Sequence, residues 1–219
     1  MGFDFEYALS IVPQILKALP TTFLVTVLCC FCAAVLAFAM EFTRRSGRIL
    51  GYVMRFIIDA IRSTPILAQL YFVFFVLPFY GLTLPPMVVG VLGLSVYYSG
   101  YLAEVYKAGI DAIPRGQWDA AKALHLSRWD TISVIIAPQM LRNIAAPMGN
   151  YFVSILKATP YLAVIAVPEM LGEAFDIASD TFRYAEPILV VGIIFLSLAL
   201  VIAQLVRLLE ERMQQSLKR

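Results

Sequence analysis

Residues 103 to 130 read Ala103-Glu-Val-Tyr-Lys-Ala-Gly-Ile-Asp-Ala-Ile-Pro-Arg-Gly-Gln-Trp-Asp-Ala-Ala-Lys-Ala-Leu-His-Leu-Ser-Arg-Trp-Asp130, a charged segment broken by Pro114 and Gly116. The chain turns apolar again through Ile135 to Gln139. Of the 219 residues, 61% are hydrophobic and 15% are charged, whereas a soluble domain usually carries about 25% charged residues. The sequence therefore predicts a membrane protein with one conspicuous polar loop that acts outside the bilayer.

The composition also argues against several other classes of protein. The formal net charge of +2 is too small to indicate nucleic-acid binding, and no basic stripe is combined with stacking aromatic residues. Cys29, Cys30 and Cys32 lie in one apolar run, so a disulfide framework is not expected. With one histidine in the chain, we also expect no metal site built from cysteine and histidine.

Five apolar segments approach the roughly 20 residues that a helix needs to cross a bilayer. They cover about residues 18–42, 65–79, 87–106, 144–167 and 187–209. The second is short, and residues 52–61 are a candidate extension of it as a tilted or interfacial helix. No internal repeat or linker divides the chain. We therefore predict an all-α polytopic membrane protein with about five transmembrane helices, forming a single domain over residues 1–219.

Charge asymmetry predicts how these helices are oriented. Acidic residues dominate the loops on one side of the predicted membrane, namely Asp4, Glu6, Glu169, Glu173, Asp176, Asp180 and Glu186. The loops on the other side are basic. Basic residues gather between spans one and two, between spans three and four, and after span five: Arg44, Arg45, Arg48, Arg55, Lys107, Arg115, Lys122, Arg128, Arg142, Arg207, Arg212, Lys218 and Arg219. Because basic loops stay in the cytoplasm, we expect the N-terminus outside and the C-terminus inside.

The polar loop, about residues 107–142, is predicted to be a rigid helical elbow. We expect a helix from about Trp118 to Leu126, with Asp119 in its first turn, where a carboxylate interacts favourably with the helix dipole. Ser127 is a plausible N-cap for a following helix, and Asp130 completes a capping box. The apolar residues of the loop are expected to form a face that inserts into another protein: Trp118, Ala121, Leu124 and Trp129.

The loop resembles the EAA loop of ABC importer permeases. The resemblance consists of Asp119-Ala120-Ala121, three residues, position 125, nine residues, and Ile135-Ile136-Ala137-Pro138. Three other stretches resemble the polar amino-acid branch of that family, namely Ile113-Pro-Arg-Gly-Gln117, Arg62-Ser-Thr-Pro-Ile-Leu67 and Leu156-Lys-Ala-Thr-Pro160. The resemblance covers most of the chain and implies the type I ABC importer fold, in a bacterial inner membrane.

The resemblance also implies partners. They are a cytoplasmic ABC ATPase dimer that binds the EAA loops, a second permease subunit (a paralogue or the same chain) and an external solute-binding protein. This chain has no Gly-x-x-x-x-Gly-Lys-Ser/Thr phosphate loop, so we expect ATP and magnesium on the ATPase, and neither a cofactor nor catalysis in this subunit. The implied ATPase-coupling residues are Arg115, Gly116, Gln117, Asp119, Ala120, Ala121, His125, Ser127 and Pro138.

The sequence departs from the family pattern at three positions. Asp119 stands for glutamate and keeps the charge with a shorter reach, and Ala137 stands for leucine. His125 stands for the usual glycine, so we expect a turn there that does not rely on a free positive φ. The branch also often has Asp or Asn where Ala158 stands, which suggests that this subunit lacks one polar substrate contact that a paired permease supplies.

Polar residues within the spans are candidates for a substrate path. Lys157 lies near the middle of span four, where a charge costs roughly 2.5–3.5 kcal/mol on insertion scales. Asn150 and Ser154 are spaced to share its helix face. Thr64, Gln69 and Thr159 are further candidates, and Pro160 is expected to kink the helix. Helix–helix hydrogen bonding, or snorkelling of the lysine, stays open as the structural alternative.

Other functions remain open on the sequence alone. An ion-coupled secondary transporter is expected to show paired repeats and more intramembrane carboxylates, and an enzyme or its membrane anchor subunit is the other alternative. Two charged pairs with helical spacing, Glu104 with Lys107 and Asp59 with Arg62, are predicted to be structural. Among substrates, polar amino acids, opines and compatible solutes such as ectoine all fit.

Overall fold

The computed structural model describes residues 2–215, with side chains omitted at position 210 and at positions 213–215. No β-strand occurs among the described residues, which confirms the all-α prediction. The elements are α1 (Phe5–Leu16), α2 (Leu19–Arg45), α3 (Arg48–Ser63), α4 (Ile66–Tyr71), the π-helical η1 (Phe72–Val76), the 3-10 helix η2 (Leu77–Tyr80), α5 (Pro86–Asp111), α6 (Arg115–Ala123), α7 (Arg128–Asp130), the π-helical η3 (Thr131–Ile136), α8 (Ala137–Ala158), the 3-10 helix η4 (Thr159–Ile165), α9 (Met170–Thr181) and α10 (Ala185–Gln215).

The described helices agree with about five membrane crossings. Three of them, α2, α5 and α10, are long and apolar enough to cross a bilayer without a break. Two bent pairs of helices are long and apolar enough when taken together: α3 with Ile66–Tyr80, at 100°, and Arg128–Ile165 with α9, at 42°. Within residues 2–215 the count is therefore three continuous spans, or up to five if each bent pair is one span.

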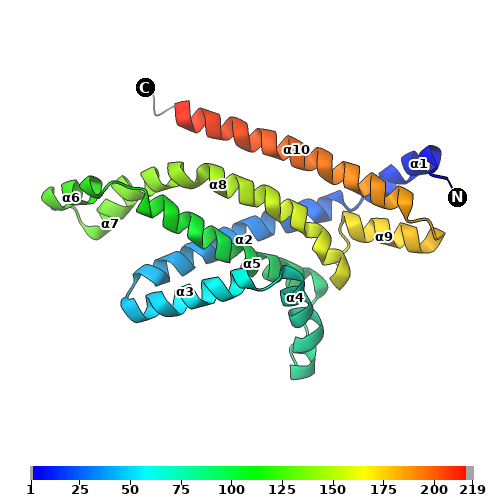
Figure 1. Cartoon of the computed structure of the whole chain (residues 1–219), viewed down its shortest axis with the longest axis horizontal. Helices are drawn as coiled ribbons and strands as arrows, with labels where there is room; N and C mark the ends of the chain where they lie inside the picture. The colour runs from blue at the N-terminus through cyan, green and yellow to red at the C-terminus, as the bar shows by residue number, and fades with distance from the viewer. Residues whose placement is uncertain (1, 216–219) are drawn as a thin grey trace.

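The second span differs from the short apolar segment predicted for residues 65–79, because α3, which contains the candidate extension 52–61, adjoins Ile66–Tyr80 at a bend of 100°. Pro65 disfavours the helical conformation in the residue before it, and Thr64 is extended, with φ −100° and ψ 130°. Gln69 then stabilises the bend, because its Nε2 donates to the carbonyl oxygens of Ile61 (2.9 Å) and Thr64 (3.2 Å). The segment after the bend projects from the body of the molecule in Figure 1.

The fourth span also begins earlier than the predicted residue 144, because helical structure is continuous from Arg128 through η3 into α8. Pro138 lies at the start of α8, directly after the π-helical turns of η3. Proline has no N–H to donate to the preceding turn. A π-helical segment relaxes the backbone before such a residue and lets the helix continue.

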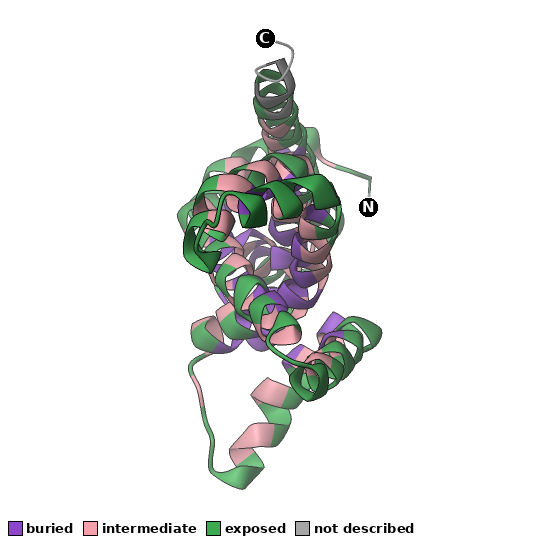
Figure 2. Cartoon of the chain, turned by 90° about the vertical axis from the view of Figure 1, so that its left-hand side faces the viewer, coloured by how far each residue is buried: buried purple, intermediate pink, exposed green. Residues whose placement is uncertain are grey.

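The centre of the bundle is a seam of small residues between α2 and α5. Val25, Cys29, Ala33 and Ala37 recur at every fourth position of α2 and are fully buried. Small side chains let two membrane helices approach closely, and Figure 2 shows the buried residues lining the inside of the bundle. Glu41 continues the same row and is 2% exposed. A carboxylate at that depth needs partners, which the charged network described below supplies.

The basic regions gather at one end of the molecule. In Figure 1, the turn between α2 and α3, the elements α6 and α7, and the end of α10 lie at one end, while α1 and α9 lie at the other. This arrangement agrees with the predicted separation of basic from acidic loops. Lys218 and Arg219, which also entered that prediction, lie outside the described residues.

At the end that holds α1 and α9, Asp4 joins the start of α1 to the turn between α9 and α10. It caps α1 by accepting from the Tyr7 backbone N–H at 3.0 Å, and it lies 3.5 Å from Arg183. The Tyr7 hydrogen bond, followed by the Arg183 guanidinium, holds the pKa of Asp4 below its ordinary value. The stabilisation from this ionised group is therefore present above the carboxylate's unfolded pKa and is lost as the pH falls through the lowered one.

Gly51 of α3 is predicted to be the position in the α2–α3 turn that tolerates an added side chain least. A Cβ atom at this position would lie 2.8 Å from the backbone oxygen of Arg44, which moves only if α2 and α3 separate. We expect Gly51→Ala to destabilise the protein by about 1–3 kcal/mol, seen as a lower midpoint in thermal unfolding of the purified chain. Gly192→Ala is the matched control, because nothing lies within 4 Å of that Cβ. An unchanged or higher midpoint for Gly51→Ala would contradict this contact.

Candidate functional site

The first candidate site is the elbow, which we define as residues 115–136, comprising α6, α7 and η3. It lies at the end of the molecule that also holds the basic turn between α2 and α3 (Figure 1). Helix α6 begins at Arg115, directly after the extended Pro114, and ends at Ala123. The prediction of Asp119 in the first turn was therefore wrong: Asp119 is in the second turn, and its carboxylate lies 3.9 Å from the Lys122 ammonium.

Helix α6 ends in a Schellman motif built around His125. The Leu126 N–H donates to the Ala121 carbonyl (3.1 Å), and the His125 N–H donates to the Lys122 carbonyl (2.9 Å). This pair of bonds requires a left-handed residue after the helix, usually glycine, and His125 adopts φ +52°. The expectation that the turn here does not rely on a positive φ was wrong, because the two hydrogen bonds impose the left-handed conformation on His125 despite its side chain.

Restoring glycine at this position is expected to stabilise the elbow. A left-handed conformation costs a residue with a Cβ about 1–2 kcal/mol, so His125→Gly should gain on the order of 1 kcal/mol locally. Hydrogen exchange of the Leu126 amide, which closes the motif, measures this as slower exchange. His125→Ala is the control and should exchange no more slowly than the wild type, since alanine carries the same strain. Equal exchange in the glycine and alanine variants would show that the turn is unstrained.

Ser127 caps the N-terminus of the short helix α7, as predicted. Its Oγ accepts from the Asp130 backbone N–H at 3.1 Å and donates to Asp130 Oδ2 at 2.6 Å. The carboxylate therefore binds the serine hydroxyl instead of the serine backbone N–H of an ordinary capping box. The cap closes α7 against η3, which leads without a break into α8. The elbow is thus continuous with a membrane helix.

The elbow's apolar residues divide between an inward and an outward side. Trp118 packs against the core and Ala121 is 2% exposed, so these two do not belong to an outer face as predicted. Leu124 and Trp129 are 72% and 75% exposed. The other candidate coupling positions, Arg115, Gly116, Gln117, Asp119 and Ala120, are exposed, and so are His125, Ser127 and Pro138. Large exposed apolar side chains with a charged rim are typical of a protein-binding surface.

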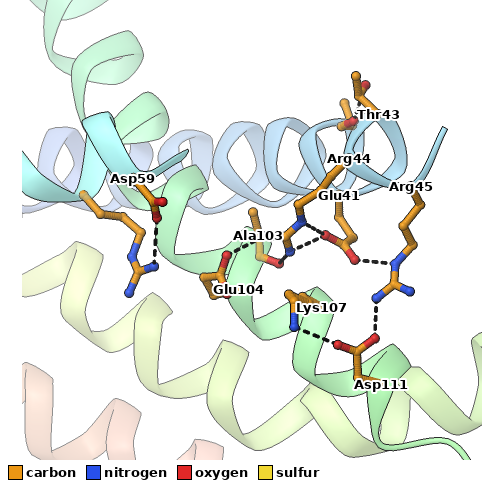
Figure 3. A network of polar contacts seen from close by, with 11 residues as sticks. Glu41, Thr43, Arg44, Arg45, Asp59, Ala103, Glu104, Lys107 and Asp111 are labelled. Carbon is orange, nitrogen blue, oxygen red and sulfur yellow. Dashed lines mark hydrogen bonds and ion pairs between the residues drawn. The ribbon is translucent and has the colours of Figure 1, made fainter. Parts of the chain in front are cut away.

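A charged network clamps α2 to α5 beside the elbow (Figure 3). Glu41 accepts from Arg44 Nε (2.6 Å) and Arg45 Nε (2.5 Å), and the Arg44 Nη1 reaches Glu104 Oε1 at 2.5 Å. Asp111, the last residue of α5, bonds Arg45 at 2.7 Å and Lys107 at 2.8 Å. The network therefore joins α2 to the end of α5, just before the elbow begins.

The predicted pair of Glu104 with Lys107 was wrong. Both residues find other partners, because Arg44 approaches Glu104 from α2 and Asp111 lies one turn after Lys107. The predicted pair of Asp59 with Arg62 is present at 4.0 Å. At the other side of the elbow, Gln139 Nε2 donates to Gln117 Oε1 at 3.2 Å and so joins α8 to α6.

The second candidate site is the substrate path. On α8, Asn150 and Lys157 are exposed and Ser154 is half-buried between them on the same helix face. The Ser154 hydroxyl donates to the Asn150 carbonyl at 3.0 Å, and the Tyr98 hydroxyl donates to the Ser154 carbonyl at 3.1 Å. Among the described side chains, no carboxylate lies within 4.0 Å of Lys157. These three residues therefore offer polar groups at one place.

The remaining path candidates lie elsewhere. Thr64 is exposed at the α3–α4 bend, where its hydroxyl donates to the Ala60 carbonyl at 2.8 Å, and Gln69 holds the same bend. Thr159 is fully buried, and its hydroxyl donates to the Leu156 carbonyl at 2.9 Å. In this conformation the side-chain donors of these three residues bond to backbone, and the structure does not gather them with the α8 residues.

A cluster of tyrosines was missed in the sequence. The hydroxyls of Tyr97 and Tyr101 lie 3.2 Å apart on α5, and the Tyr101 ring lies 5.9 Å from that of Tyr151 on α8. The Arg62 guanidinium stands 5.3 Å from the centre of the Tyr101 ring. The four-residue spacing of the two α5 tyrosines was the available signal, but Arg62 and Tyr151 come from other elements. Ring faces and a guanidinium together suit a ligand with both charges.

Among the residues described, no group of three His, Cys, Asp or Glu side chains is placed to hold a metal ion. The site consists instead of an exposed elbow, a charged clamp and a polar face on α8. The elbow leads through η3 into α8 without a break, and the clamp joins the end of α5 to α2. This arrangement is suited to transmitting a displacement, because each helix moves as a rigid element and the clamp couples α2 to α5.

Comparison with known proteins gives concordant results. The family described as "Binding-protein-dependent transport system inner membrane component" matches residues 32–215. The chain is 39% identical to the probable amino-acid ABC transporter permease protein y4tG of Sinorhizobium fredii, over 94% of this chain and 90% of that protein. It is 31% identical to the glutamine transport system permease protein GlnP of Escherichia coli, over 98% of this chain and 99% of that protein.

Solved structures show the same fold. A chain described as "Crystal structure of an amino acid ABC transporter with histidines" superposes with a TM-score of 0.90 and 30% identity, covering 97% of this chain and 100% of that one. A chain of the MetNI methionine ABC transporter, in inward-facing conformations, superposes with a TM-score of 0.74 at 14% identity, over 96% and 99% of the two chains. The second likeness concerns the fold alone.

Proposed function

This chain belongs to the binding-protein-dependent transport system inner membrane component family, and from that membership we propose that it forms part of the import path for polar amino acids or related zwitterions. It is a multi-pass membrane permease subunit of an ABC transporter. The observation that carries the proposal is the elbow, whose outer face is exposed while Trp118 and Ala121 anchor it to the bundle. A separate ATPase can move the permease only through a surface that is exposed for docking and also fixed to the helix bundle, and the elbow has both properties.

The motor is proposed to be a dimer of cytoplasmic ABC ATPases. Leu124 and Trp129 would insert into the ATPase, and the charges of Arg115 and Asp119 would set the orientation at the rim. ATP and magnesium would be bound by the ATPase, and hydrolysis would occur there. Closure of the ATPase dimer would displace the elbow, and η3 and the Gln117–Gln139 bond would pass the displacement to α8. The side on which the path opens would then alternate.

The substrate class is proposed from the relatives and the path together. Relatives are named for glutamine and for arginine, which are polar amino acids with both an ammonium and a carboxylate. The Tyr101 ring would interact with the ammonium and Arg62 with the carboxylate. Asn150 and Lys157 offer further contacts from α8. Opines and compatible solutes such as ectoine carry the same pair of charges and remain the substrate alternatives.

The assembly is proposed to contain a second permease subunit, either a paralogue or another copy of this chain, and an external solute-binding protein. Support for the second subunit comes from the projecting segment after the α3–α4 bend (Figure 1), where Phe79 and Tyr80 are 89% and 79% exposed. Ala158 is buried, and we propose that the polar substrate contact this branch often has at its position comes from the second permease. The basic end, with the elbow, is proposed to face the cytoplasm, which leaves the N-terminus outside.

Co-isolation and energy dependence test this function. The permease, expressed with its neighbouring genes, should co-purify with an ATPase, and uptake into proteoliposomes should require ATP and the external binding protein. An ion-coupled transporter would instead take up substrate without ATP and lose uptake when an ionophore collapses the gradient. That second pattern would overturn the proposal. Binding of glutamine, arginine and ectoine to the external protein, measured separately, identifies the substrate.

A further inference from the structure

A basic hollow lies at the turn between α2 and α3, outside the elbow and the path. Its volume is about 240 Å³. Six residues line it: Arg44, Gly47, Arg48, Gly51, Tyr52 and Arg55. Gly47 precedes α3 and provides no side-chain cap for its first turn. Three arginines therefore surround a space whose remaining wall is largely glycine backbone and one tyrosine.

Two of the three arginines carry charge that the protein does not neutralise. Arg44 is paired with Glu41 and Glu104. Among the described side chains, no carboxylate lies within 4.0 Å of Arg48 or Arg55. A guanidinium offers a planar fork of donors that matches a phosphate group with two parallel hydrogen bonds. The hollow is thus suited to a phosphate anion.

The side chains around the hollow indicate whether that phosphate belongs to a soluble anion or to a phospholipid. On α3, Ile49, Val53 and Phe56 are 80%, 50% and 74% exposed, so an apolar surface adjoins the arginines. The Arg55 guanidinium lies 6.0 Å from the centre of the Tyr52 ring, and tyrosine and arginine are typical of the boundary between lipid and water. A soluble anion would contact the arginines alone. A phospholipid covers both.

We propose that this hollow binds the headgroup phosphate of an anionic glycerophospholipid, whose acyl chains lie along Ile49, Val53 and Phe56. The lipid would neutralise Arg48 and Arg55 and brace the turn between α2 and α3, next to the charged clamp. The proposal concerns lipid binding and does not depend on the substrate or on the ATPase. Its test therefore needs no transport measurement.

The test uses the full chain, purified in mild detergent and titrated with phosphatidylglycerol or phosphatidylcholine in native mass spectrometry. We expect retained phosphatidylglycerol and little phosphatidylcholine on the wild type. The double variant Arg48→Gln/Arg55→Gln should bind phosphatidylglycerol more weakly, by roughly fivefold for each arginine removed. The matched control, Arg128→Gln/Arg142→Gln, removes two exposed arginines that do not line the hollow and should bind within about twofold of the wild type.

Several outcomes would overturn the proposal. Equal retention of the two lipids by the wild type would do so without reference to any variant, even if the double variant failed to fold. Equal losses in the double variant and its control would indicate general charge attraction. Displacement of the lipid by millimolar inorganic phosphate would indicate a soluble-anion site. Unchanged lipid binding with weaker ATPase co-purification in the double variant would assign the arginines to a protein contact.

Discussion

Reversing the charge at Asp119 or at Arg115 is expected to reduce uptake to background while the permease stays in the membrane in normal amounts. The Asp119 side chain is 73% exposed and lies 3.9 Å from its nearest partner, Lys122, so the fold loses little when it changes. Like charges placed opposite each other in an interface cost several kcal/mol, which corresponds to a loss of binding of more than about a hundredfold. The measurement is uptake by cells or proteoliposomes carrying Asp119→Lys or Arg115→Glu, with membrane content from quantitative immunoblotting.

Glu211→Lys provides the control for this prediction. Glu211 is half-exposed near the end of α10 and pairs with Arg207 at 3.1 Å, at the same end of the molecule as the elbow but outside it. Its uptake should stay within about twofold of the wild type, since a surface pair contributes little. Full uptake by both elbow variants, with the ATPase still attached, would refute docking through the elbow.

The second large effect is expected from Arg44→Met. This change leaves the Glu41 carboxylate buried, at 2% exposure, with the single remaining partner Arg45. Breaking a buried ion pair by removing one partner costs about 3–5 kcal/mol. We expect a much lower thermal midpoint in detergent and a smaller amount of protein in the membrane.

A double variant separates the charge from the packing. In Glu41→Leu/Arg44→Met the uncompensated carboxylate is gone, so most of the lost stability should return, because apolar replacements of a buried pair are often tolerated. Arg207→Met, which breaks the exposed pair with Glu211, should cost less than about 1 kcal/mol. If Arg44→Met were no less stable than Arg207→Met, the clamp would not be the stabilising feature described here.

Some of the site could be predicted because its signals are local. Ser127 and Asp130 are three residues apart, and the cap that they form was predicted from that spacing alone. His125 shows the limit of such reasoning. The family pattern marks its position as a glycine position, yet whether histidine takes the left-handed conformation depends on the two hydrogen bonds that end α6. The low propensity of histidine for a positive φ led to the prediction of a turn without one. The hydrogen bonds at the end of α6 nevertheless hold His125 in the left-handed conformation.

Other features of the site could not be predicted because their partners are distant in sequence. Glu104 has Lys107 at helical spacing, but Arg44, sixty positions away, is its partner. Trp118 and Leu124 look equivalent in the sequence, whereas packing turns one against the core and leaves the other exposed. The tyrosine cluster joins α3, α5 and α8, and no local pattern contains all three.

The sequence by itself determined the fold class, about five crossings, the placement of the basic loops at one end and the position of the elbow. It could do so because a bilayer demands long apolar segments whose backbone bonds close within each helix. The tertiary structure alone decided which charges of α2 and α5 pair in the clamp, and that Trp118, unlike Leu124, packs against the core. Each of these depends on how helices approach one another, and that geometry follows from packing between residues that the sequence does not place together.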